Sequence, residues 1–205
     1  MSDTETNNTK QSATKIIAST DSLQIELVDK VGTIDNEHLI KISESLAIEY
    51  GEKYLLTEKT IDIYFNRDGS LPFIARYRNN IIGYIIGLPI ELLSQEPWAR
   101  LDEHYGKFNT IYTYAFVIKK ECKGDGTAKS LKKVYLNWAK KRKGIRFVTG
   151  HVKLGISSNF NGNIKIVGQI ENWQGTGKTF EYYRRELDPE QIYAPRTEPP
   201  LTDRL

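Results

Sequence analysis

The sequence has a single cysteine, Cys122, only three histidines, and no apolar run of the roughly 20 residues that a membrane span needs. One cysteine excludes an intramolecular disulfide and a zinc site built from cysteines. The three histidines stand apart from metal-ligand neighbours, so they predict no metal site. The N-terminus lacks the basic start and apolar centre of a secretory signal. From these absences we expect a protein of the cytoplasm without a metal.

Length and composition favour one folded domain with two tails. The chain has 205 residues, of which 39% are hydrophobic and 27% charged, and this is typical of a globular domain with a core of its own. The N-terminal stretch is polar, and the C-terminal stretch contains prolines without periodicity. We therefore expect a disordered tail at 1–20, a domain at 21–188 and a flexible tail at 189–205.

A turn with two glycines joins an apolar strand, from Ile111, to a basic amphipathic helix that ends near Gly144. Gly124 and Gly126 can take positive φ angles and bring backbone amides close to an anion. A helix start leaves about four N–H groups unpaired and carries roughly half a positive charge, which suits phosphate. The apolar run at 145–148 predicts the next strand, so the segment is a strand, turn, helix and strand.

Charge is concentrated around this turn. Between Lys119 and Arg146 there are eleven basic residues and two acidic ones, or +9, and since the chain carries +3 the remainder carries 3 minus 9, or -6. A locally basic surface beside a glycine turn indicates a site for a polyphosphate ligand. A solvated helix face explains part of the same pattern.

The other predicted elements follow from apolar periodicity and turn residues. Asn79-Asn80 predicts a two-residue hairpin turn. The insertion at 89–107 is expected to be helical in part and is a candidate lining of a substrate pocket, or an ordinary connection. The predicted elements are strands at 23–28, 73–78, 81–88 and 179–187, and helices at 36–50, 57–65 and 164–173.

Lys123 to Ala128 resembles the acyl-CoA pyrophosphate loop of the GNAT superfamily of N-acetyltransferases, R/Q-x-x-G-x-G/A. Gly126 and Ala128 match this pattern, and Lys123 replaces the usual arginine or glutamine with a point charge. The resemblance extends from about residue 23 to residue 187. It implies an α/β fold with a GNAT-like mixed, mostly antiparallel sheet of about seven strands flanked by helices.

The resemblance also implies positions for the coenzyme. Backbone groups of the strand before the loop would hold the pantetheine arm, loop amides would hold the pyrophosphate, and one asparagine, Asn159 or Asn161, would contact the arm. The implied cofactor-binding residues are Phe116, Val117, Ile118, Lys123, Gly124, Asp125, Gly126, Thr127, Ala128 and Asn159.

The tyrosine that often donates a proton in this family has no counterpart at the matching position of this sequence. Members often have a tyrosine on the helix after the asparagine, and Val167 takes its place here in the stretch 166–172. Another group must then protonate the leaving thiolate, or proximity alone must suffice. Tyr112 and Tyr114 share one face of the strand before the loop, and Tyr114 is the catalytic candidate.

The function implied is that of an enzyme, an N-acetyltransferase that moves an acetyl group from acetyl-CoA, its cosubstrate, to a primary amine by direct attack. The amine partner and the oligomeric state, a homodimer included, stay open. Two alternatives remain: a catalytically weak CoA-binding relative, and a nucleic-acid-binding module that uses the basic helix at 127–143. Residues 172–179 nearly fit a nucleotide-binding P-loop, but Asn172 stands where the first glycine must be, so they predict a hairpin turn.

Overall fold

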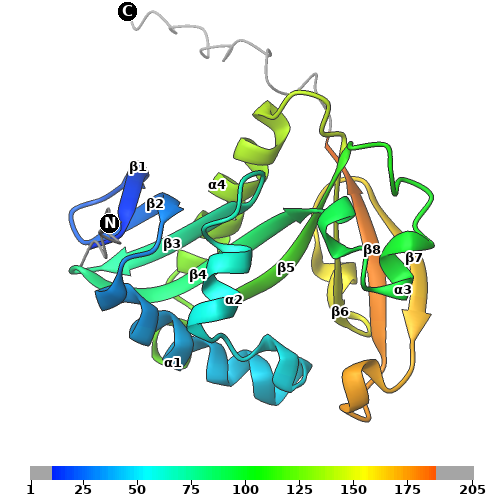
Figure 1. Ribbon diagram of the computed structural model, residues 1–205, viewed down its shortest axis with the longest axis horizontal. Helices are drawn as coiled ribbons and strands as arrows, with labels where there is room; N and C mark the ends of the chain where they lie inside the picture. The colour runs from blue at the N-terminus through cyan, green and yellow to red at the C-terminus, as the bar shows by residue number, and fades with distance from the viewer. Residues whose placement is uncertain (1–10, 188–205) are drawn as a thin grey trace, which may run out of the picture.

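The computed structural model describes residues 11–187, which form one open sheet with helices on both faces (Figure 1). Its strands are β1 (Ala13–Ser19), β2 (Leu23–Lys30), β3 (Leu71–Tyr77), β4 (Asn80–Pro89), β5 (Thr110–Ile118), β6 (Phe147–Lys153), β7 (Ile164–Ile170) and β8 (Phe180–Glu186). Its α-helices are α1 (Thr33–Tyr50), α2 (Glu58–Tyr64), α3 (Pro97–Arg100) and α4 (Thr127–Lys141).

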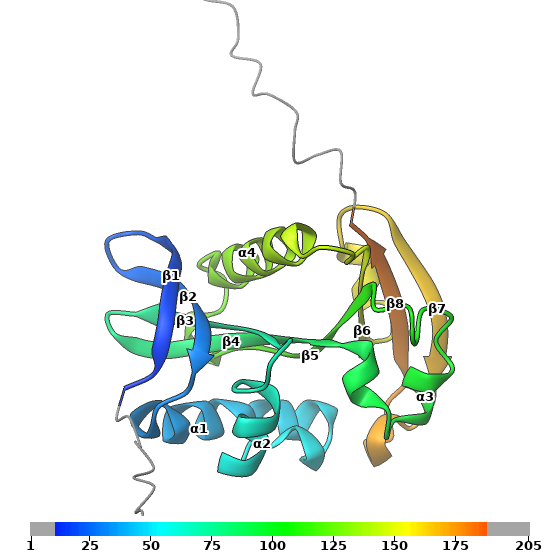
Figure 2. The same cartoon turned by 45° about the horizontal axis from the view of Figure 1, so that its top comes forward.

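The sheet has eight strands in the order β1-β2-β3-β4-β5-β6-β8-β7, and every neighbouring pair is antiparallel except β5 and β6. Helices α1 and α2 cover one face, and α4 covers the other (Figure 2). The predicted fold class is confirmed, with eight strands where about seven were expected.

Each face of the sheet has its own apolar core. Helix α1 buries Leu39, Ile42 and Leu46, whereas α4 buries Leu131, Tyr135 and Ala139 at intervals of four residues. This spacing places each set on one side of its helix. Strand β5 therefore lies between two cores and presents side chains to both.

The prediction of a disordered tail at 1–20 is wrong for residues 13–19, which form strand β1 and pair with β2. Few of its side chains are buried, so composition gave no sign of a strand. The backbone ladder and one polar contact hold it: Ser12 Oγ donates to Asp35 Oδ2 on α1 at 2.6 Å and accepts from the backbone of Gly32 at 2.9 Å. The other predicted tail, 189–205, lies outside the described residues.

The prediction of a helix over 164–173 is also wrong, because residues 164–170 form strand β7. The spacing of Ile164, Val167, Ile170 and Trp173 predicts one face of a helix, but residues 164–170 pair with β8 as an edge strand. A register shift between Ile166 and Gly168 leaves Val167 as an extra residue. Such a bulge breaks the alternation of apolar and polar residues, and the spacing then imitates a helix. Residues 166–172 therefore do not correspond to the family's tyrosine-bearing helix.

The remaining local predictions hold with small shifts. The hairpin between β3 and β4 turns at Arg78 and Asn79, whose φ angles are 47° and 68°, one residue earlier than expected. The insertion at 89–107 is partly helical, as expected, with a short 3-10 helix at Ile90–Leu93 followed by α3. Residues 172–179 form the turn between β7 and β8. None of the helices in the described part of the chain combines the length and apolarity of a bilayer-crossing segment.

Two strand glycines allow a matched test of packing between β4 and α4. A Cβ at Gly87 would lie 2.7 Å from the Tyr135 ring and from Ile111, whereas a Cβ at Gly168 in β7 would meet nothing within 4 Å. We predict that Gly87→Ala lowers the unfolding free energy by about 1–3 kcal/mol through overpacking. Gly168→Ala should leave it unchanged or raise it by up to about 1 kcal/mol. Urea unfolding measures both, and equal stability of the two variants would contradict this packing.

Candidate functional site

Among the strands of residues 11–187, β5 and β6 are the only parallel pair, and they separate soon after their pairing begins. Pairing covers Thr110 to Tyr112 on β5 and Phe147 to Thr149 on β6, and neither strand pairs with the other beyond that point. Both strands continue, to Ile118 and to Lys153 respectively. A wedge therefore opens between them at their carboxyl ends, where open α/β sheets bind ligands.

A β-bulge in β5 lies where the strands separate. Ala115 pairs with Ile86 on β4, but the next pair joins Thr113 to Gly87, so Tyr114 is an extra residue. A bulge bends its strand and increases its twist. Strand β5 thus follows β4 on one edge while its other edge turns away from β6.

The wedge exposes backbone hydrogen-bonding groups of β5. The Lys119 backbone N–H donates to the carbonyl of Ile82 at 2.8 Å, and in an antiparallel ladder alternate residues face the same neighbour. Val117 therefore directs its backbone groups to β4, whereas Phe116 and Ile118 direct theirs to the wedge. Of the three β5 residues predicted to hold a pantetheine arm, two have backbone groups free to do so.

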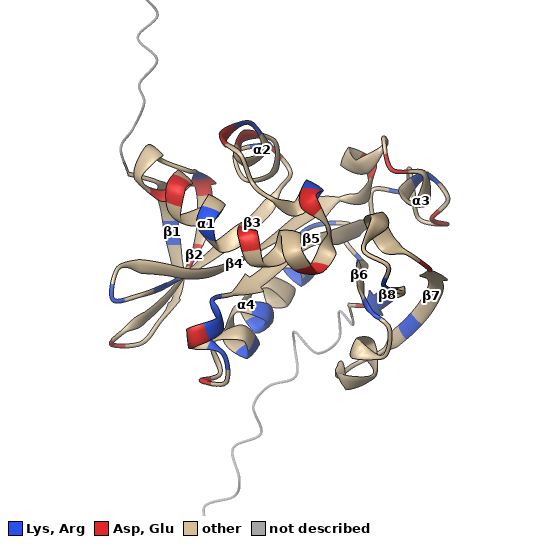
Figure 3. Cartoon of the chain, turned by 90° about the horizontal axis from the view of Figure 1, so that it is seen from below, with Lys and Arg blue, Asp and Glu red and all other residues tan. Residues whose placement is uncertain are grey.

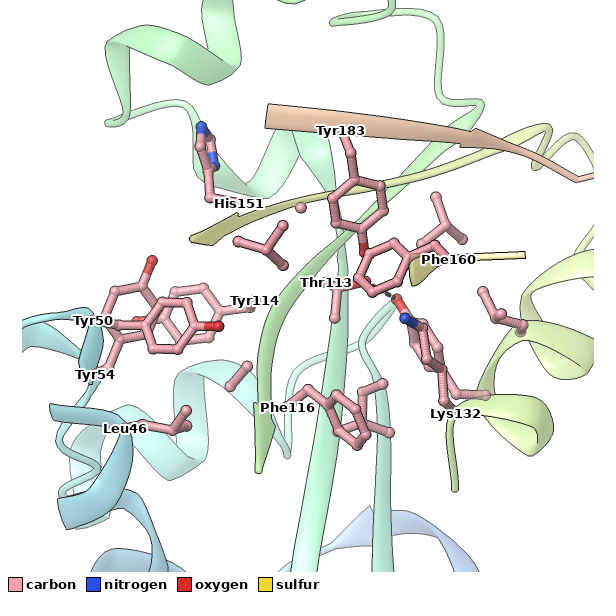
Figure 4. A pocket seen from close by; sticks show the side chains of 17 residues that line it. Leu46, Tyr50, Tyr54, Thr113, Tyr114, Phe116, Lys132, His151, Phe160 and Tyr183 are labelled. Carbon is pink, nitrogen blue, oxygen red and sulfur yellow. Dashed lines mark hydrogen bonds between the residues drawn. The ribbon is translucent and has the colours of Figure 1, made fainter. Parts of the chain in front are cut away.

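A cavity occupies the wedge and reaches from one face of the sheet toward the other (Figure 4). Its empty space is about 580 Å³, a volume that includes open solvent at the mouth. No residue of the insertion at 89–107 lines it. The lining comprises Leu46, Tyr50 and Tyr54 from the α1 side, Ile85, Thr113, Tyr114, Ala115 and Phe116 from the sheet, Lys132, Tyr135 and Leu136 from α4, Val148, Gly150, His151 and Val152 from β6, and Phe160 and Tyr183.

The glycine loop lies at the start of α4. Gly124 and Gly126 have φ angles of 96° and 87°, which confirms the expected positive values. Lys123 to Gly126 are exposed, and Gly126 provides no side-chain cap. The loop thus presents its backbone to solvent, as an anion site requires.

One loop amide is already paired. The Thr127 backbone N–H donates to Asp125 Oδ1 at 2.8 Å, and this hydrogen bond lowers the pKa of Asp125 below its usual value. The carboxylate therefore stays ionised and takes the place that an external anion would take at the Thr127 amide. Thr127 itself is buried, and Ala128 half-buried.

Charge differs between the two faces of the sheet (Figure 3). Helix α4 contains five lysines and no acid, whereas α1 contains four acids and one lysine. A negatively charged ligand is therefore attracted to the α4 face, and a cation to the α1 face.

Tyr114, the catalytic candidate, lies on the α1 side of the cavity wall. As predicted, Tyr112 and Tyr114 belong to the same core. The Tyr114 hydroxyl donates to the carbonyl of Lys53 at 3.4 Å, and its ring packs on Tyr64 with 4.1 Å between centroids. Burial raises the pKa of Tyr114 far above that of a free phenol, so the hydroxyl keeps its proton.

Asn159 and Asn161, the two candidates for a contact with the coenzyme arm, lie beside the cavity. Asn159 ends a short 3-10 helix, Ile156–Asn159, and both Asn159 and Asn161 are exposed and outside the lining. Phe160, between them, enters the cavity and packs edge-on against Tyr183 with centroids 5.1 Å apart. A contact between Asn159 and a ligand remains a prediction.

His151 is a cavity residue that sequence spacing did not single out. It is stacked between Trp173 and Tyr182, with ring centroids 4.0 and 4.6 Å away, and its Nδ1 lies 3.0 Å from the Tyr112 hydroxyl. Its Nε2 is buried and has no hydrogen-bond partner. Burial, and secondarily the charge of Lys53, lower the pKa of His151 to about 3. The ring is therefore neutral near pH 7 and a poor base. Among residues 11–187, no group of three or more His, Cys, Asp or Glu side chains is arranged to hold a metal ion.

The sequence matches a model of the acetyltransferase (GNAT) family over residues 39–155, more than half of the chain. This range includes β5, the glycine loop and α4. A comparison with curated proteins found no match.

Solved structures share the fold at low sequence identity. NAA60 from Arabidopsis thaliana, in complex with a bisubstrate analogue, has a TM-score of 0.60 at 12% identity over 82% of this chain and all of its own. The ribosomal-protein-S18-alanine N-acetyltransferase of Escherichia coli gives 0.55 at 10% identity over 86% of this chain and 98% of its own. A GNAT family acetyltransferase from Elizabethkingia anophelis with acetyl-CoA bound gives 0.52 at 16% identity over 82% of this chain and all of its own.

The buried histidine predicts a pH-dependent stability. An unfolded histidine has a pKa near 6.5, so between about pH 6.5 and 3 the unfolded chain binds one more proton than the folded one. The contribution of His151 to the unfolding free energy is therefore fully present above pH 6.5. It falls as the pH drops and is smaller by about 2 kcal/mol at pH 5. We expect His151→Gln to lack this loss in urea unfolding at pH 7 and 5. His38→Gln, which removes an exposed histidine, should keep it, and equal slopes in all three proteins would contradict the prediction.

Proposed function

The chain belongs to the acetyltransferase (GNAT) family, and on that premise we propose that it moves an acetyl group from acetyl-CoA to a primary amine. The observation that carries the proposal is the wedge between β5 and β6, which opens beside the glycine loop and the lysine-rich α4. An extended, amide-containing arm can pair with the free backbone of a strand edge as an added strand would.

The proposed position of the coenzyme runs from the glycine loop to the bulge of β5. Its phosphates would lie at residues 123–128, where α4 begins and positive charge gathers. Its arm would enter the wedge along Phe116 and Ile118, whose backbone groups face the opening. The thioester would then come to the bulge at Tyr114. In support, the Elizabethkingia anophelis relative has acetyl-CoA bound.

The acceptor would approach from the α1 side. The cavity ends there on Tyr50 and Tyr54, and the acidic surface of α1 attracts a protonated amine. After loss of its proton, the amine attacks the thioester carbonyl and the thiolate leaves. Holding the two reactants together supplies up to about 7–11 kcal/mol of the barrier reduction. A primary amine acceptor agrees with the E. coli relative, which is named for acetylating an alanine of a ribosomal protein.

Two groups at the bulge are suited to the charges that develop. The backbone N–H of the extra residue, Tyr114, has no ladder partner and is proposed to donate to the carbonyl oxygen as it becomes negative. The Tyr114 hydroxyl, which is protonated at neutral pH, is proposed to donate a hydrogen bond and then its proton to the thiolate; its raised pKa makes it a weaker acid than a free phenol, so position and not acidity recommends it.

A CoA-binding protein with little turnover is the second candidate. Two observations favour it: the Asp125 carboxylate already occupies the Thr127 amide, and His151 is too weak a base to deprotonate an ammonium group. Thiol release in the presence of a panel of amines separates the two candidates.

Two lysines at opposite ends of α4 test the phosphate site. Lys123→Glu places a negative charge in the loop, whereas Lys143→Glu makes the same change beyond the far end of the helix. We expect Lys123→Glu to raise the KM for acetyl-CoA roughly tenfold, which corresponds to a loss of about 1.4 kcal/mol of binding free energy. The increase in KM should be smaller at high salt. Lys143→Glu should stay near wild type. Thermal shift with CoA and thiol release measure both. No shift by CoA in the wild type would remove the proposal.

Removing one hydroxyl tests the proton donor. Tyr114→Phe should lower kcat roughly a hundredfold with little change in KM, since a positioned acid contributes at least that much. Tyr64→Phe removes the hydroxyl of the ring that packs on Tyr114 but does not line the cavity, and it should retain kcat within about twofold. Full activity of Tyr114→Phe would assign the proton to another group.

A further inference from the structure

Lys132 lies in an unusual place for a lysine. It belongs to α4, yet its side chain is half-buried and lines the cavity (Figure 4), whereas Lys129, Lys133 and Lys141 of the same helix are exposed. Its Nζ lies 3.4 Å from the centroid of the Phe160 ring. The ammonium group is thus set against an apolar wall inside the wedge.

No acid balances the charge of Lys132. Within residues 11–187 no ion pair joins it to a carboxylate, and none of the described cavity-lining residues is aspartate or glutamate. Its charged neighbour is Arg185 on β8, another cation, which lies 6.0 Å from the same ring. Burying a cation without a counter-charge is unfavourable.

The Lys132 amine is therefore easier to deprotonate than a surface lysine. Burial first, and the charge of Arg185 second, lower its pKa to about 8. The other titratable groups facing the cavity are all neutral near pH 7: Tyr50 and Tyr54 from the α1 side, Tyr114 on β5, Tyr135 on α4, His151 on β6 and Tyr183 on β8. About a tenth of Lys132 is thus neutral and nucleophilic at pH 7, far more than of an ordinary lysine with a pKa near 10.4.

Lys132 also lies on the path proposed for the coenzyme arm. It follows Ala128, the last residue of the glycine loop, by four residues, so the two share one side of α4 about 6 Å apart along the axis. Leu136, one further turn along, also lines the cavity. Thr113, on the opposite wall, hydrogen-bonds Tyr135 at 3.0 Å at the inner end of the wedge.

We propose that Lys132 is an internal acetyl acceptor, which takes the acetyl group of bound acetyl-CoA when no external amine is present. The inference depends on the proposed function for the donor. The neutral Nζ attacks the thioester carbonyl carbon, a C–N bond forms and the C–S bond breaks. The nitrogen loses its second proton, the thiolate gains it, and the products are Nε-acetyl-Lys132 and CoA. The new amide carries no charge, so it removes the cation that lies against Phe160 without a counter-charge.

The test follows acetyl incorporation into the full-length protein. Purified protein is incubated with acetyl-CoA without amine, and intact mass and peptide mapping report how many acetyl groups are bound and where. We expect one acetyl group per chain, at Lys132, with an initial rate that rises from pH 6 to about 8 and then levels off. Lys132→Arg keeps a positive charge but should lose this modification completely. Lys133→Arg, at the exposed neighbouring position, should retain it.

The outcomes separate this inference from the proposed function. If CoA shifts the melting temperature of the wild type and of Lys132→Arg equally but Lys132 stays unmodified, the inference is wrong and the coenzyme site stands. Acetylation spread over exposed lysines in proportion to their number would also overturn it, since that pattern is chemical and not directed by the cavity. If acetyl-CoA does not bind the wild type at all, both fail.

Discussion

The whole site depends on how briefly β5 and β6 pair. A parallel pair normally continues its ladder along both strands, and here an extra residue at the bulge ends it after Tyr112. Each backbone group left unpaired costs about 1–3 kcal/mol if it stays buried without a partner. The hydrogen bond between Thr113 and Tyr135 and the ring of Phe160 lie in this opening. A ligand that pairs with the opened edge recovers part of that cost, and so the same feature that weakens the sheet prepares it to bind.

The two faces of the sheet differ in charge, and the cavity connects them. The lysine-rich α4 and its exposed loop lie on one face, and the acidic α1 lies on the other. The cavity passes between them through the opened sheet. In the proposed function, the anionic donor and the cationic acceptor would reach the same point from opposite sides of the sheet. Lys132 is the exception to this division, since it carries positive charge from the α4 face into the apolar interior.

Local patterns in the sequence predicted the local parts of this structure. The glycine loop, the helix that follows it and the hairpin between β3 and β4 depend on residues next to one another, so turn chemistry and periodicity identified them. Strand β1 was missed because its backbone pairing and Ser12, not burial, hold it. Strand β7 was mistaken for a helix because its bulge at Val167 shifts the alternation. The cavity residues Tyr50, Lys132 and Phe160 come together only through the tertiary fold, and no spacing in the sequence marks them.

In the proposed complex the coenzyme arm lies along the edge of β5 that faces the wedge. Amide hydrogen exchange, resolved residue by residue with and without CoA, reports on this edge. The amides of Phe116 and Ile118 should exchange more slowly when CoA is bound, whereas that of Val117, already paired with β4, should change little. If CoA binds while Phe116 and Ile118 exchange as before, the coenzyme lies elsewhere and this account of the wedge is wrong.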